Sequence, residues 1–325
     1  MIYIDNEITN PYFNLASEEY LLKNTDQECF MLWRNESCIV VGKNQNTISE
    51  INTDFVEENK IPVVRRLTGG GAVFHDLGNL NFTFIVNDAE SLRNFKKFVQ
   101  PVIEVLNDLG INAEFTGRND LVIGERKFAG NAQAFHNKRV IHHGAILFSA
   151  DMTKLAKALK PKPIKFEGKS VKSVTSRVTN IAEHLKTELS VVQFKDMILD
   201  KVKKYDKESQ VLRFNDEEIR QIKKLEAEKY STWEWNFGSS PKYNIESIRK
   251  FSGGTVELHL HVEDGVIKEC RIFGDFFGKK DVAGLEASLL GEKHSRDSIE
   301  SLLGKLNLDD YMFNVKPEEL AEMFI

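Results

Sequence analysis

Short strand-like segments follow one another closely along the first 150 residues, and this feature constrains the fold more than any other. Most are rich in β-branched or aromatic residues, and several are joined by connections too short to hold a crossover helix. They lie at residues 2–4, 29–33, 37–41, 61–66, 80–86, 120–124, 127–135 and 140–148. Short connections favour antiparallel neighbours, so we expect an α+β fold with a mixed, largely antiparallel sheet rather than a doubly wound parallel one.

Two segments of the same region carry helix signals. Asn10 and Pro11 are typical of a helix start, and apolar residues recur behind them. A second helix is predicted over residues 95–109, where Gly110 suits a left-handed cap. We expect both helices to pack against the sheet.

The chain changes character after residue 150. Residues 154–177 hold seven lysines and one arginine against a single acid, Glu167, and we interpret them as a basic loop between helices. One explanation is a solvated loop. The other is a mobile flap that binds an anion or a binding site for an acidic partner. Residues 191–229 are strongly charged and read as helical.

A second domain is expected near the C-terminus. Residues 238–242 are typical of a linker, and residues 253–273 carry the pattern of a hairpin that turns at 263–265. Helical patterns follow near 282–290 and 297–303. The sequence therefore predicts a catalytic domain at 1–244 and a small α+β accessory domain at 245–325.

Composition excludes several classes of protein. Hydrophobic residues make up 41% of the 325 positions, and no run of about 18 apolar residues occurs, so we expect no transmembrane helix. The first ten residues lack the basic stretch of a secretory signal, and three cysteines without metal-type spacing indicate free thiols in a cytoplasmic protein. With 44 basic against 49 acidic residues, the net charge of −5 does not favour nucleic acid.

The first segment suited to chemistry runs from Arg65 to Asp76 and contains three consecutive glycines, at 69–71. Glycines let the backbone turn tightly and let its N–H groups approach a ligand, and the neighbouring Arg66 offers forked donors for phosphate or carboxylate. The run lacks the ending of a P-loop and the following helix of a dinucleotide site. A plain hairpin turn with surface arginines is the alternative.

Two further segments stand out. Lys127 lies on an expected strand beside the small residues Ala129, Gly130 and Ala132, which leave room for a ligand, although a surface lysine on a hairpin fits as well. His142 and His143 are consecutive on another strand and point to opposite faces, so one metal cannot use both. The residues by themselves indicate a site for an anionic ligand, and a nucleotide is the best candidate.

Several motifs together resemble the lipoate–protein ligase A family. They occur in family order as Arg-Arg-x-x-Gly-Gly-Gly-Ala-Val-Phe-His-Asp-Leu-Gly-Asn at 65–79, Gly-Arg-Asn-Asp-Leu at 117–121, Lys-x-x-Gly-x-Ala at 127–132, His-His-Gly at 142–144, Ser-Arg-Val-Thr-Asn at 176–180 and Trp-Glu-Trp-Asn-Phe-Gly at 233–238. The resemblance implies the biotin/lipoate ligase superfamily. It implies an ATP-dependent enzyme that converts lipoate to lipoyl-AMP, releasing pyrophosphate, and then transfers the lipoyl group to a carrier lysine.

The resemblance also assigns residues and partners. It implies Lys127 as the catalytic residue, Asp120 as a candidate Mg²⁺ ligand, and the basic loop at residues 154–177 as an adenylate-binding loop. The ATP site would comprise Arg66, Gly71, Ala72, Val73, Phe74 and Lys127. The lipoate pocket would comprise Trp33, Arg66, His75, Lys127 and His143. The implied carriers are the lipoyl domains of 2-oxoacid dehydrogenase E2 subunits and the glycine-cleavage H protein, and we expect a monomer.

Alternative functions within and outside the superfamily remain open at this stage. Octanoyl and lipoyl transferases use a cysteine thioester, but no cysteine lies between Cys38 and Cys270. A transferase that accepts only preformed lipoyl-AMP and a non-catalytic lipoate-binding protein are further alternatives. Pyrophosphate release from ATP and lipoate separates these alternatives from a full ligase.

Overall fold

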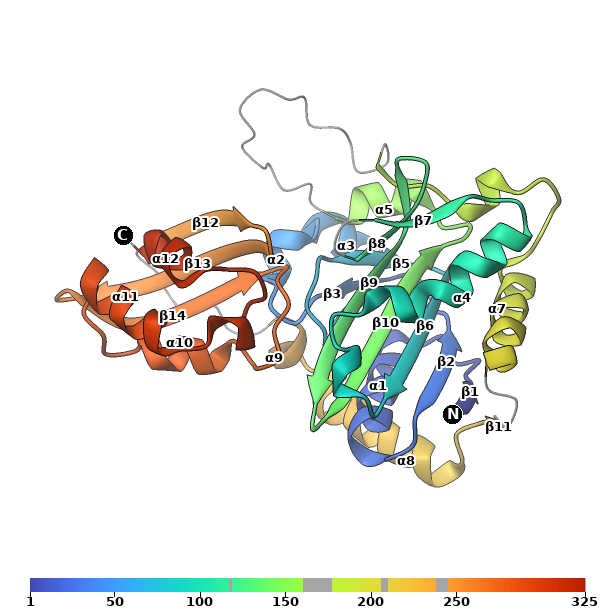
Figure 1. The fold of residues 1–325 in the computed structure, drawn as a ribbon, viewed down its shortest axis with the longest axis horizontal. Helices are drawn as coiled ribbons and strands as arrows, with labels where there is room; N and C mark the ends of the chain where they lie inside the picture. Colours follow the sequence, from blue (N-terminus) through green and yellow to red (C-terminus); the bar gives the residue numbers. More distant parts are fainter. Residues whose placement is uncertain (117–118, 160–176, 206–209, 238–244, 325) are drawn as a thin grey trace.

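The protein consists of a large body around an eight-stranded sheet and a smaller body around a three-stranded sheet (Figure 1). The structure is a computed structural model that describes residues 1–116, 119–159, 177–205, 210–237 and 245–324. The expected α+β class is confirmed, because both sheets carry packed helices.

The large sheet is mixed and mostly antiparallel, as the short connections predicted. Its strand order is β11-β1-β2-β6-β10-β9-β8-β7, and only the β1–β11 and β1–β2 pairs run parallel. The strands are β1 (Ile2–Asp5), β2 (Cys29–Trp33), β6 (Asn79–Val86), β7 (Ala113–Thr116), β8 (Asp120–Ile123), β9 (Arg126–His136), β10 (Arg139–Leu147) and β11 (Gln210–Leu212). β7 and β11 were not predicted, because both are short and lack an apolar run.

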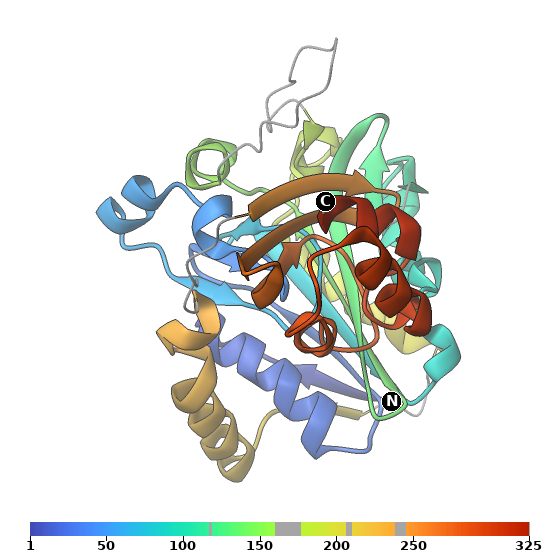
Figure 2. The same ribbon diagram turned by 90° about the vertical axis from the view of Figure 1, so that its left-hand side faces the viewer.

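Both faces of this sheet are buried, and β2 shows how. Phe30 and Leu32 enter one hydrophobic core, whereas Cys29, Met31 and Trp33 enter another on the opposite face. Helices α4 (Phe95–Asp108) and α7 (Val191–Tyr205) cover the first face, and α1 (Pro11–Asn24) and α8 (Asp216–Leu225) cover the second (Figure 2). The all-buried pattern of β2 follows from this double cover.

The predicted helix starts and stops are largely confirmed. The Oδ1 of Asn10 accepts hydrogen bonds from the N–H groups of Tyr12 and Phe13, at 2.9 and 3.1 Å, and so caps α1. Gly110 follows the C-cap residue Leu109 of α4 and has a φ of +77°, a conformation that suits glycine.

A small second sheet carries the glycine-rich segment. Strand β3 (Cys38–Val41) pairs parallel with β4 (Val63–Arg65) and antiparallel with β5 (Val73–His75). β5 was not predicted, because three residues close behind a glycine triplet give too short a pattern. Short helices α2 (Thr47–Glu50) and α3 (Thr53–Glu58) connect β3 to β4.

Two expectations for the middle of the chain are wrong. Residues 154–158 are not loop but belong to α5 (Met152–Ala158), which Asp151 caps by accepting from two backbone N–H groups. The stretch 191–229 is not continuous helix, because β11 separates α7 from α8. A π-helix over Glu226–Tyr230 and the short α9 (Trp233–Asn236) follow. Most of the expected basic loop, residues 160–176, lies outside the described residues.

The C-terminal body has the expected hairpin and one further strand. β13 (Gly254–Glu263) and β14 (Val266–Gly274) pair across a turn in which Asp264 and Gly265 both have positive φ, and β12 (Ile245–Phe251) joins them. Helices α10 (Ala283–Leu289), α11 (Arg296–Lys305) and α12 (Pro317–Ala321) cover the sheet. The expected linker at 238–242 lies outside the described residues.

The two bodies touch beside the glycine triplet. The N–H of Gly274 donates to the carbonyl of Asn44, and Lys43 Nζ lies 3.1 Å from Asp281 Oδ2. The ring of Phe277 packs near Gly69 and Gly70. Among the described residues, no helix has the length and apolar character needed to cross a membrane.

Candidate functional site

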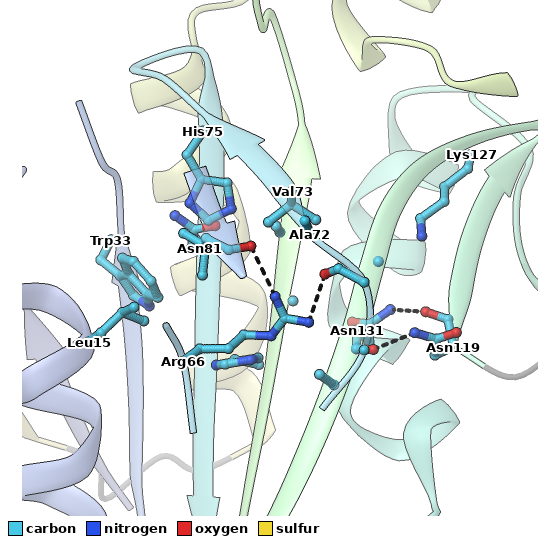
Figure 3. Close-up of a pocket in the computed structure, with 18 residues that line it drawn as sticks. Leu15, Trp33, Arg66, Ala72, Val73, His75, Asn81, Asn119, Lys127 and Asn131 are labelled. Carbon is cyan, nitrogen blue, oxygen red and sulfur yellow. Dashed lines mark hydrogen bonds between the residues drawn. The ribbon is translucent and has the colours of Figure 1, made fainter. Parts of the chain in front are cut away.

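A cavity of about 120 Å³ opens where the small sheet meets the large one (Figure 3). Its walls come from β2, β6, β9 and β10 of the large sheet and from the glycine-rich segment between β4 and β5. Leu15, Trp33 and Val40 make one part apolar, whereas Arg66 and Lys127 bring two cationic side chains to its wall. The arrangement combines an apolar slot with positive charge.

Arg66 shapes the glycine triplet through its side chain. Its Nη2 donates to the carbonyls of Gly69 and Gly71, at 2.6 and 2.9 Å, and its Nε donates to Thr68 Oγ1 at 3.0 Å. Burial lowers the pKa of Arg66 to about 10, so the guanidinium stays charged at neutral pH. Gly70 has a φ of +92°, and a Cβ there would lie 2.8 Å from Nη2, so this turn requires glycine.

Lys127 reaches the cavity from β9. Its Nζ lies 2.7 Å from Asp120 Oδ1 on the neighbouring β8. A Cβ at Gly130 would stand 2.8 Å from the same Nζ, so the small residue beside the lysine gives its side chain room. Gly130 therefore leaves room for the lysine side chain, and room for a ligand beside it stays a prediction.

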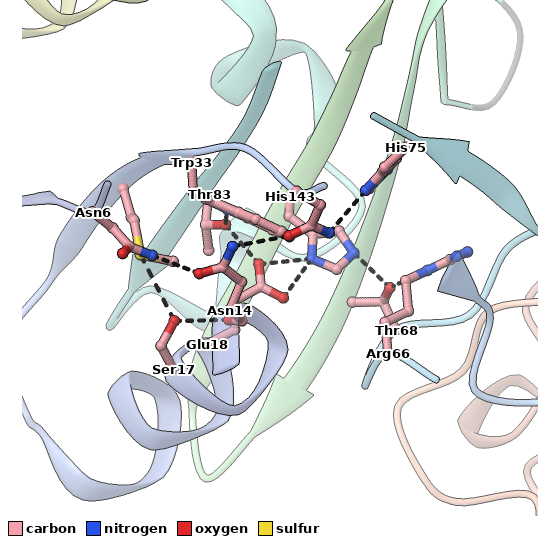
Figure 4. A network of polar contacts seen from close by, with 12 residues as sticks. Asn6, Asn14, Ser17, Glu18, Trp33, Arg66, Thr68, His75, Thr83 and His143 are labelled. Atoms are coloured by element: carbon pink, nitrogen blue, oxygen red, sulfur yellow. Dashed lines mark hydrogen bonds and ion pairs between the residues drawn. The ribbon is translucent and has the colours of Figure 1, made fainter. Parts of the chain in front are cut away.

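His143 belongs to a buried chain of hydrogen bonds (Figure 4). Its Nδ1 lies 2.9 Å from Glu18 Oε1, and because the carboxylate accepts, Nδ1 carries a proton. Its Nε2 lies 2.8 Å from Thr68 Oγ1, the oxygen that also accepts from Arg66. Thr83 donates to Glu18 at 2.6 Å and so completes the link between α1, β6 and the glycine-rich segment.

His75 and His142 are both buried and neutral. Burial lowers the pKa of His75 to about 3, and it lowers the pKa of His142 well below the ordinary value. His142 stacks on Phe82 and Phe98 in the core, while His75 lines the cavity. His142 and His143 were expected to point to opposite faces of the sheet, and of these two residues only His143 lines the cavity.

The structure brings most of the predicted site residues to one cavity. These are Trp33, Arg66, Gly71, Ala72, Val73, His75, Lys127 and His143. Phe74 does not line it, because its side chain lies in a core with Ile39 and Val63. Asp120 lies beside the cavity and reaches it through its contact with Lys127.

Sequence reasoning missed several polar residues of the site. Asn81 lines the cavity from β6, and Glu18 supports it from α1. Asn119 and Asn131 also line it, and each donates from its side-chain amide to the other's carbonyl, at 2.6 and 3.0 Å. A signal existed for Asn81: Asn79, Asn81 and Thr83 alternate with apolar residues along a strand that is buried throughout.

Neither a metal cluster nor an activated thiol is found in the described part of the chain. No group of three or more histidine, cysteine or acidic side chains gathers there in a way that could hold a metal ion. Cys29, Cys38 and Cys270 are free and buried. Burial raises the pKa of the Cys29 thiol to about 12 and also raises the pKa values of Cys38 and Cys270, so thiolate chemistry at neutral pH is disfavoured.

Fold and cavity define an α+β protein with a separate C-terminal domain and a cavity that joins apolar side chains to two cationic ones. Family models agree in detail: the lipoyl protein ligase A/B catalytic domain matches residues 10–203, and the bacterial lipoate protein ligase C-terminus matches residues 240–324. The chain belongs to the lipoate–protein ligase A/B family.

Individual relatives are similar over their full length. The chain is 43% identical to the lipoate–protein ligase LplJ of Bacillus subtilis, with 99% of each chain covered. It is also 43% identical to lipoate–protein ligase 1 of Staphylococcus aureus, with 98% of each covered.

Three solved structures are similar as well. LipL1 of P. falciparum, in complex with lipoate, has a TM-score of 0.80 at 27% identity over 94% of both chains. The bi-partite ligase of Thermoplasma acidophilum, described with its E2 lipoyl domain, has a TM-score of 0.66 and is 28% identical, and the match covers 75% of this chain and 98% of that chain. A lipoate–protein ligase A bound with ATP has a TM-score of 0.64 and is 26% identical, and the match covers 73% of this chain and 98% of that chain.

Proposed function

We propose that the protein is an ATP-dependent ligase that joins lipoate to a carrier lysine in two steps. Lipoate attacks the α-phosphate of ATP and gives lipoyl-AMP with release of pyrophosphate. The ε-amine of the carrier lysine then attacks the mixed anhydride and gives an amide with release of AMP. One observation carries the proposal: an apolar slot at Leu15, Trp33 and Val40 opens beside the cationic Arg66 and Lys127, which suits a carboxylate with an apolar tail.

Relatives support this assignment of ligands. One similar structure holds lipoate, another is bound with ATP, and a third was described together with an E2 lipoyl domain. The proposed nucleotide site comprises Arg66, the segment 71–74 and Lys127. Phe74 would contribute its backbone, because its side chain is in the core. The proposed lipoate pocket comprises Trp33, Arg66, His75, Lys127 and His143.

Lys127 is the proposed catalytic residue. Adenylation brings a carboxylate against a phosphate, and an ammonium between them offsets the repulsion while negative charge develops. A preorganised donor of this kind contributes about 2.7–4 kcal/mol to the transition state. Holding both substrates in line supplies much of the remaining acceleration.

Arg66 must exchange partners to take part. In this structure the carbonyls of Gly69 and Gly71 accept both hydrogen bonds from its Nη2. A phosphate or carboxylate is a stronger acceptor for a guanidinium than a peptide carbonyl, so an anionic ligand can replace them. Release of those carbonyls lets the glycine triplet change its shape around the ligand.

Mg²⁺ is the proposed metal, and Asp120 is the proposed residue that helps to hold it. Mg²⁺ in nucleotide sites is commonly bound by one or two protein carboxylates together with phosphate oxygens, so a single carboxylate fits this role. Bound Mg²⁺ would neutralise charge on the departing pyrophosphate.

Further parts of the proposal concern organisation. We place the domain boundary between residues 244 and 245, where β12 begins. The carriers are the lipoyl domains of 2-oxoacid dehydrogenase E2 subunits and the glycine-cleavage H protein, and the enzyme acts as a monomer. Three free, buried cysteines suit a cytoplasmic location.

Pyrophosphate release with ATP, Mg²⁺ and lipoate tests the first step, and the mass of an added lipoyl domain tests the second. Pyrophosphate together with a lipoyl mass gain on one carrier lysine supports the ligase. Pyrophosphate without mass gain limits the protein to adenylation of the substrates tested. If neither pyrophosphate nor a mass gain is observed, a transferase or a binding protein is favoured. Transfer from preformed lipoyl-AMP to the carrier then distinguishes a transferase from a binding protein.

A further inference from the structure

A chain of asparagine side chains determines which nitrogen of His75 carries the proton. The chain begins at Asn14, whose Nδ2 lies 2.9 Å from the carbonyl of Ile8 and 3.1 Å from that of Arg34. Carbonyl oxygens only accept hydrogen bonds, so the orientation of this amide is fixed. The same Nδ2 also lies 2.9 Å from Asn35 Oδ1.

Asn35 therefore turns its oxygen to Asn14 and its amide nitrogen to His75. Asn35 Nδ2 lies 3.2 Å from His75 Nδ1. Because Nδ2 can only donate, Nδ1 accepts and carries no proton. A neutral imidazole then has its proton on Nε2, and burial keeps His75 neutral. His75 thus presents an Nε2–H donor in a fixed tautomer.

This donor has no partner among the described residues, and a second donor shares the cavity wall with it. His75 is 3% exposed and Asn81 is 1% exposed, and both line the cavity (Figure 3). His75 Nε2 and Asn81 Nδ2 are buried without a hydrogen-bond partner in the described part of the chain. A buried donor without a hydrogen-bond partner lowers the stability of the folded protein. Two such donors on the wall of one cavity therefore point to a hydrogen-bond acceptor on the ligand.

The surroundings limit what that acceptor can be. Leu15, Trp33 and Val40 make this part of the cavity apolar, and both donors are uncharged. An ionised group would sit better at Arg66 and Lys127. A ring sulfur is largely apolar and accepts hydrogen bonds weakly, as the thioether of methionine does, so it suits neutral donors in an apolar wall.

We propose that His75 and Asn81 form a donor pair that recognises the sulfur-bearing ring of the acyl substrate and thereby selects lipoate over octanoate. The proposal rests on the proposed function, in which this cavity holds lipoate. Octanoate offers the same carboxylate but no acceptor in its tail, so it leaves both donors unpaired. Sites designed to hydrogen-bond a substrate reject analogues that lack the partner for this reason.

Asn81→Leu tests the donor pair, because leucine has a similar size and no polar atom. The quantity to measure is the ratio of kcat/KM for lipoate to that for octanoate in pyrophosphate release. We expect this ratio to fall about tenfold, with part of the fall coming from improved use of octanoate. An unchanged ratio would overturn the proposal, since bound water would then satisfy the donors equally with either acid.

Gln133→Leu is the matched control. The Oε1 of Gln133 accepts a hydrogen bond from the N–H of Arg93, so the Nε2 of Gln133 faces His142 Nδ1 at 3.1 Å. Gln133 therefore contacts His142 in the same way as Asn35 contacts His75. His142 does not line the cavity. We expect this control to retain the ratio of the unchanged protein, and a fall equal to that of Asn81→Leu would contradict a role confined to the cavity.

Nitrogen NMR of ¹⁵N-histidine-labelled protein gives a readout independent of turnover. We expect His75 to show a protonated Nε2 and an unprotonated Nδ1, and its Nε2–H signal to shift with saturating lipoate more than with octanoate. A proton on Nδ1, or equal shifts with both acids, would overturn the donor pair. If neither acid binds or releases pyrophosphate, the proposed function fails instead, and the two failures are thereby distinguished.

Discussion

Lys127 Nζ, from a side chain that lines the cavity, lies 2.7 Å from Asp120 Oδ1. Both side chains are more than a third exposed, at 36% and 39%. An ion pair this open to water is worth about 0–1 kcal/mol, so its separation costs little. The carboxylate therefore holds the lysine in place without preventing its transfer to a phosphate.

Lys127→Ala is expected to abolish adenylation and to leave the fold intact. The loss of a preorganised cation at the α-phosphate lowers the rate of pyrophosphate release about 100- to 1,000-fold. Arg126→Ala is the matched control, because Arg126 is the adjacent residue on β9 and its guanidinium pairs with Glu183, 3.5 Å away. Near-normal pyrophosphate release by Lys127→Ala, with unchanged circular dichroism, would refute the role given to Lys127.

Asp120→Asn separates two roles of this carboxylate. If Asp120 helps to hold Mg²⁺, the variant needs about tenfold more Mg²⁺ for half-maximal pyrophosphate release, because one of few protein ligands loses its charge. Titration of Mg²⁺ at saturating ATP and lipoate measures this directly. A lower rate with an unchanged Mg²⁺ requirement would restrict Asp120 to holding Lys127.

Thr68→Val tests the link between His143 and Arg66. The change keeps the shape of the side chain but removes the oxygen that both His143 Nε2 and Arg66 Nε contact, at 2.8 and 3.0 Å. We expect the free energy of unfolding to fall by about 1–3 kcal/mol and kcat/KM for adenylation to fall about tenfold.

Thr25→Val serves as the control for that change. Thr25 Oγ1 donates to the carbonyl of Leu21 at the end of α1, and neither residue lines the cavity. It should lower stability in urea without lowering kcat/KM. A Thr68→Val enzyme with the kinetics of this control would show that the link only supports the fold.

Stability is expected to fall as the pH drops below about 6.5, and His75 is one cause. Burial depresses its folded-state pKa to about 3, below the ordinary value of 6.5. Between those two values the unfolded chain binds a proton that the folded protein does not, so each pH unit downward costs about 1.4 kcal/mol for this group. His142 is depressed in the same direction and adds to the slope.

Urea unfolding between pH 7 and pH 5 measures this slope. His142→Phe provides the comparison, because the ring at this position stacks on Phe82 and Phe98, and phenylalanine keeps a ring without a titratable nitrogen. Its stability should depend less steeply on pH. Equal slopes for both proteins would contradict burial as the cause of the shift at His142.

Local signals predicted much of the fold. Asn10 caps α1 as expected, and residues 29–33 form β2 as expected. The sequence did not predict that β2 and β3 belong to different sheets, because local pattern does not determine which strands pair. β5 and β11 were not predicted for a related reason. Each strand has three residues and so little periodicity, and each is stabilised by pairing with a strand far away in the sequence.

The site was predictable where the sequence is locally unusual. The sequence singled out the glycine triplet and Lys127 beside Gly130, and Gly70, Gly71, Lys127 and Gly130 all line one cavity. Glu18 was missed, because an acid in a helix normally faces water, and its role depends on His143 from a strand 125 residues later. The sequence pattern did not single out Asn81, because this residue lies in a strand that is otherwise rich in apolar residues.

The accessory domain is expected to move when the adenylate forms. Gly69 lies so close to it that a Cβ there would collide with the carbonyl oxygen of Phe276, so loop and domain touch through their backbones. If an anion binds Arg66, we expect the guanidinium to release the carbonyls of Gly69 and Gly71, the loop to change shape, and this contact to be disrupted. The ion pair of Lys43 with Asp281 is partly exposed and opposes the movement weakly.

Small-angle scattering of the free protein and of the protein with lipoyl-AMP measures that movement. We expect the two profiles to differ, because the three-stranded body changes its place relative to the eight-stranded sheet. Lys127→Ala with ATP and lipoate is the control, since without adenylation it should keep the profile of the free protein. Matching profiles for the free and lipoyl-AMP states would count against the movement and would leave the carrier to reach the anhydride past a fixed accessory domain.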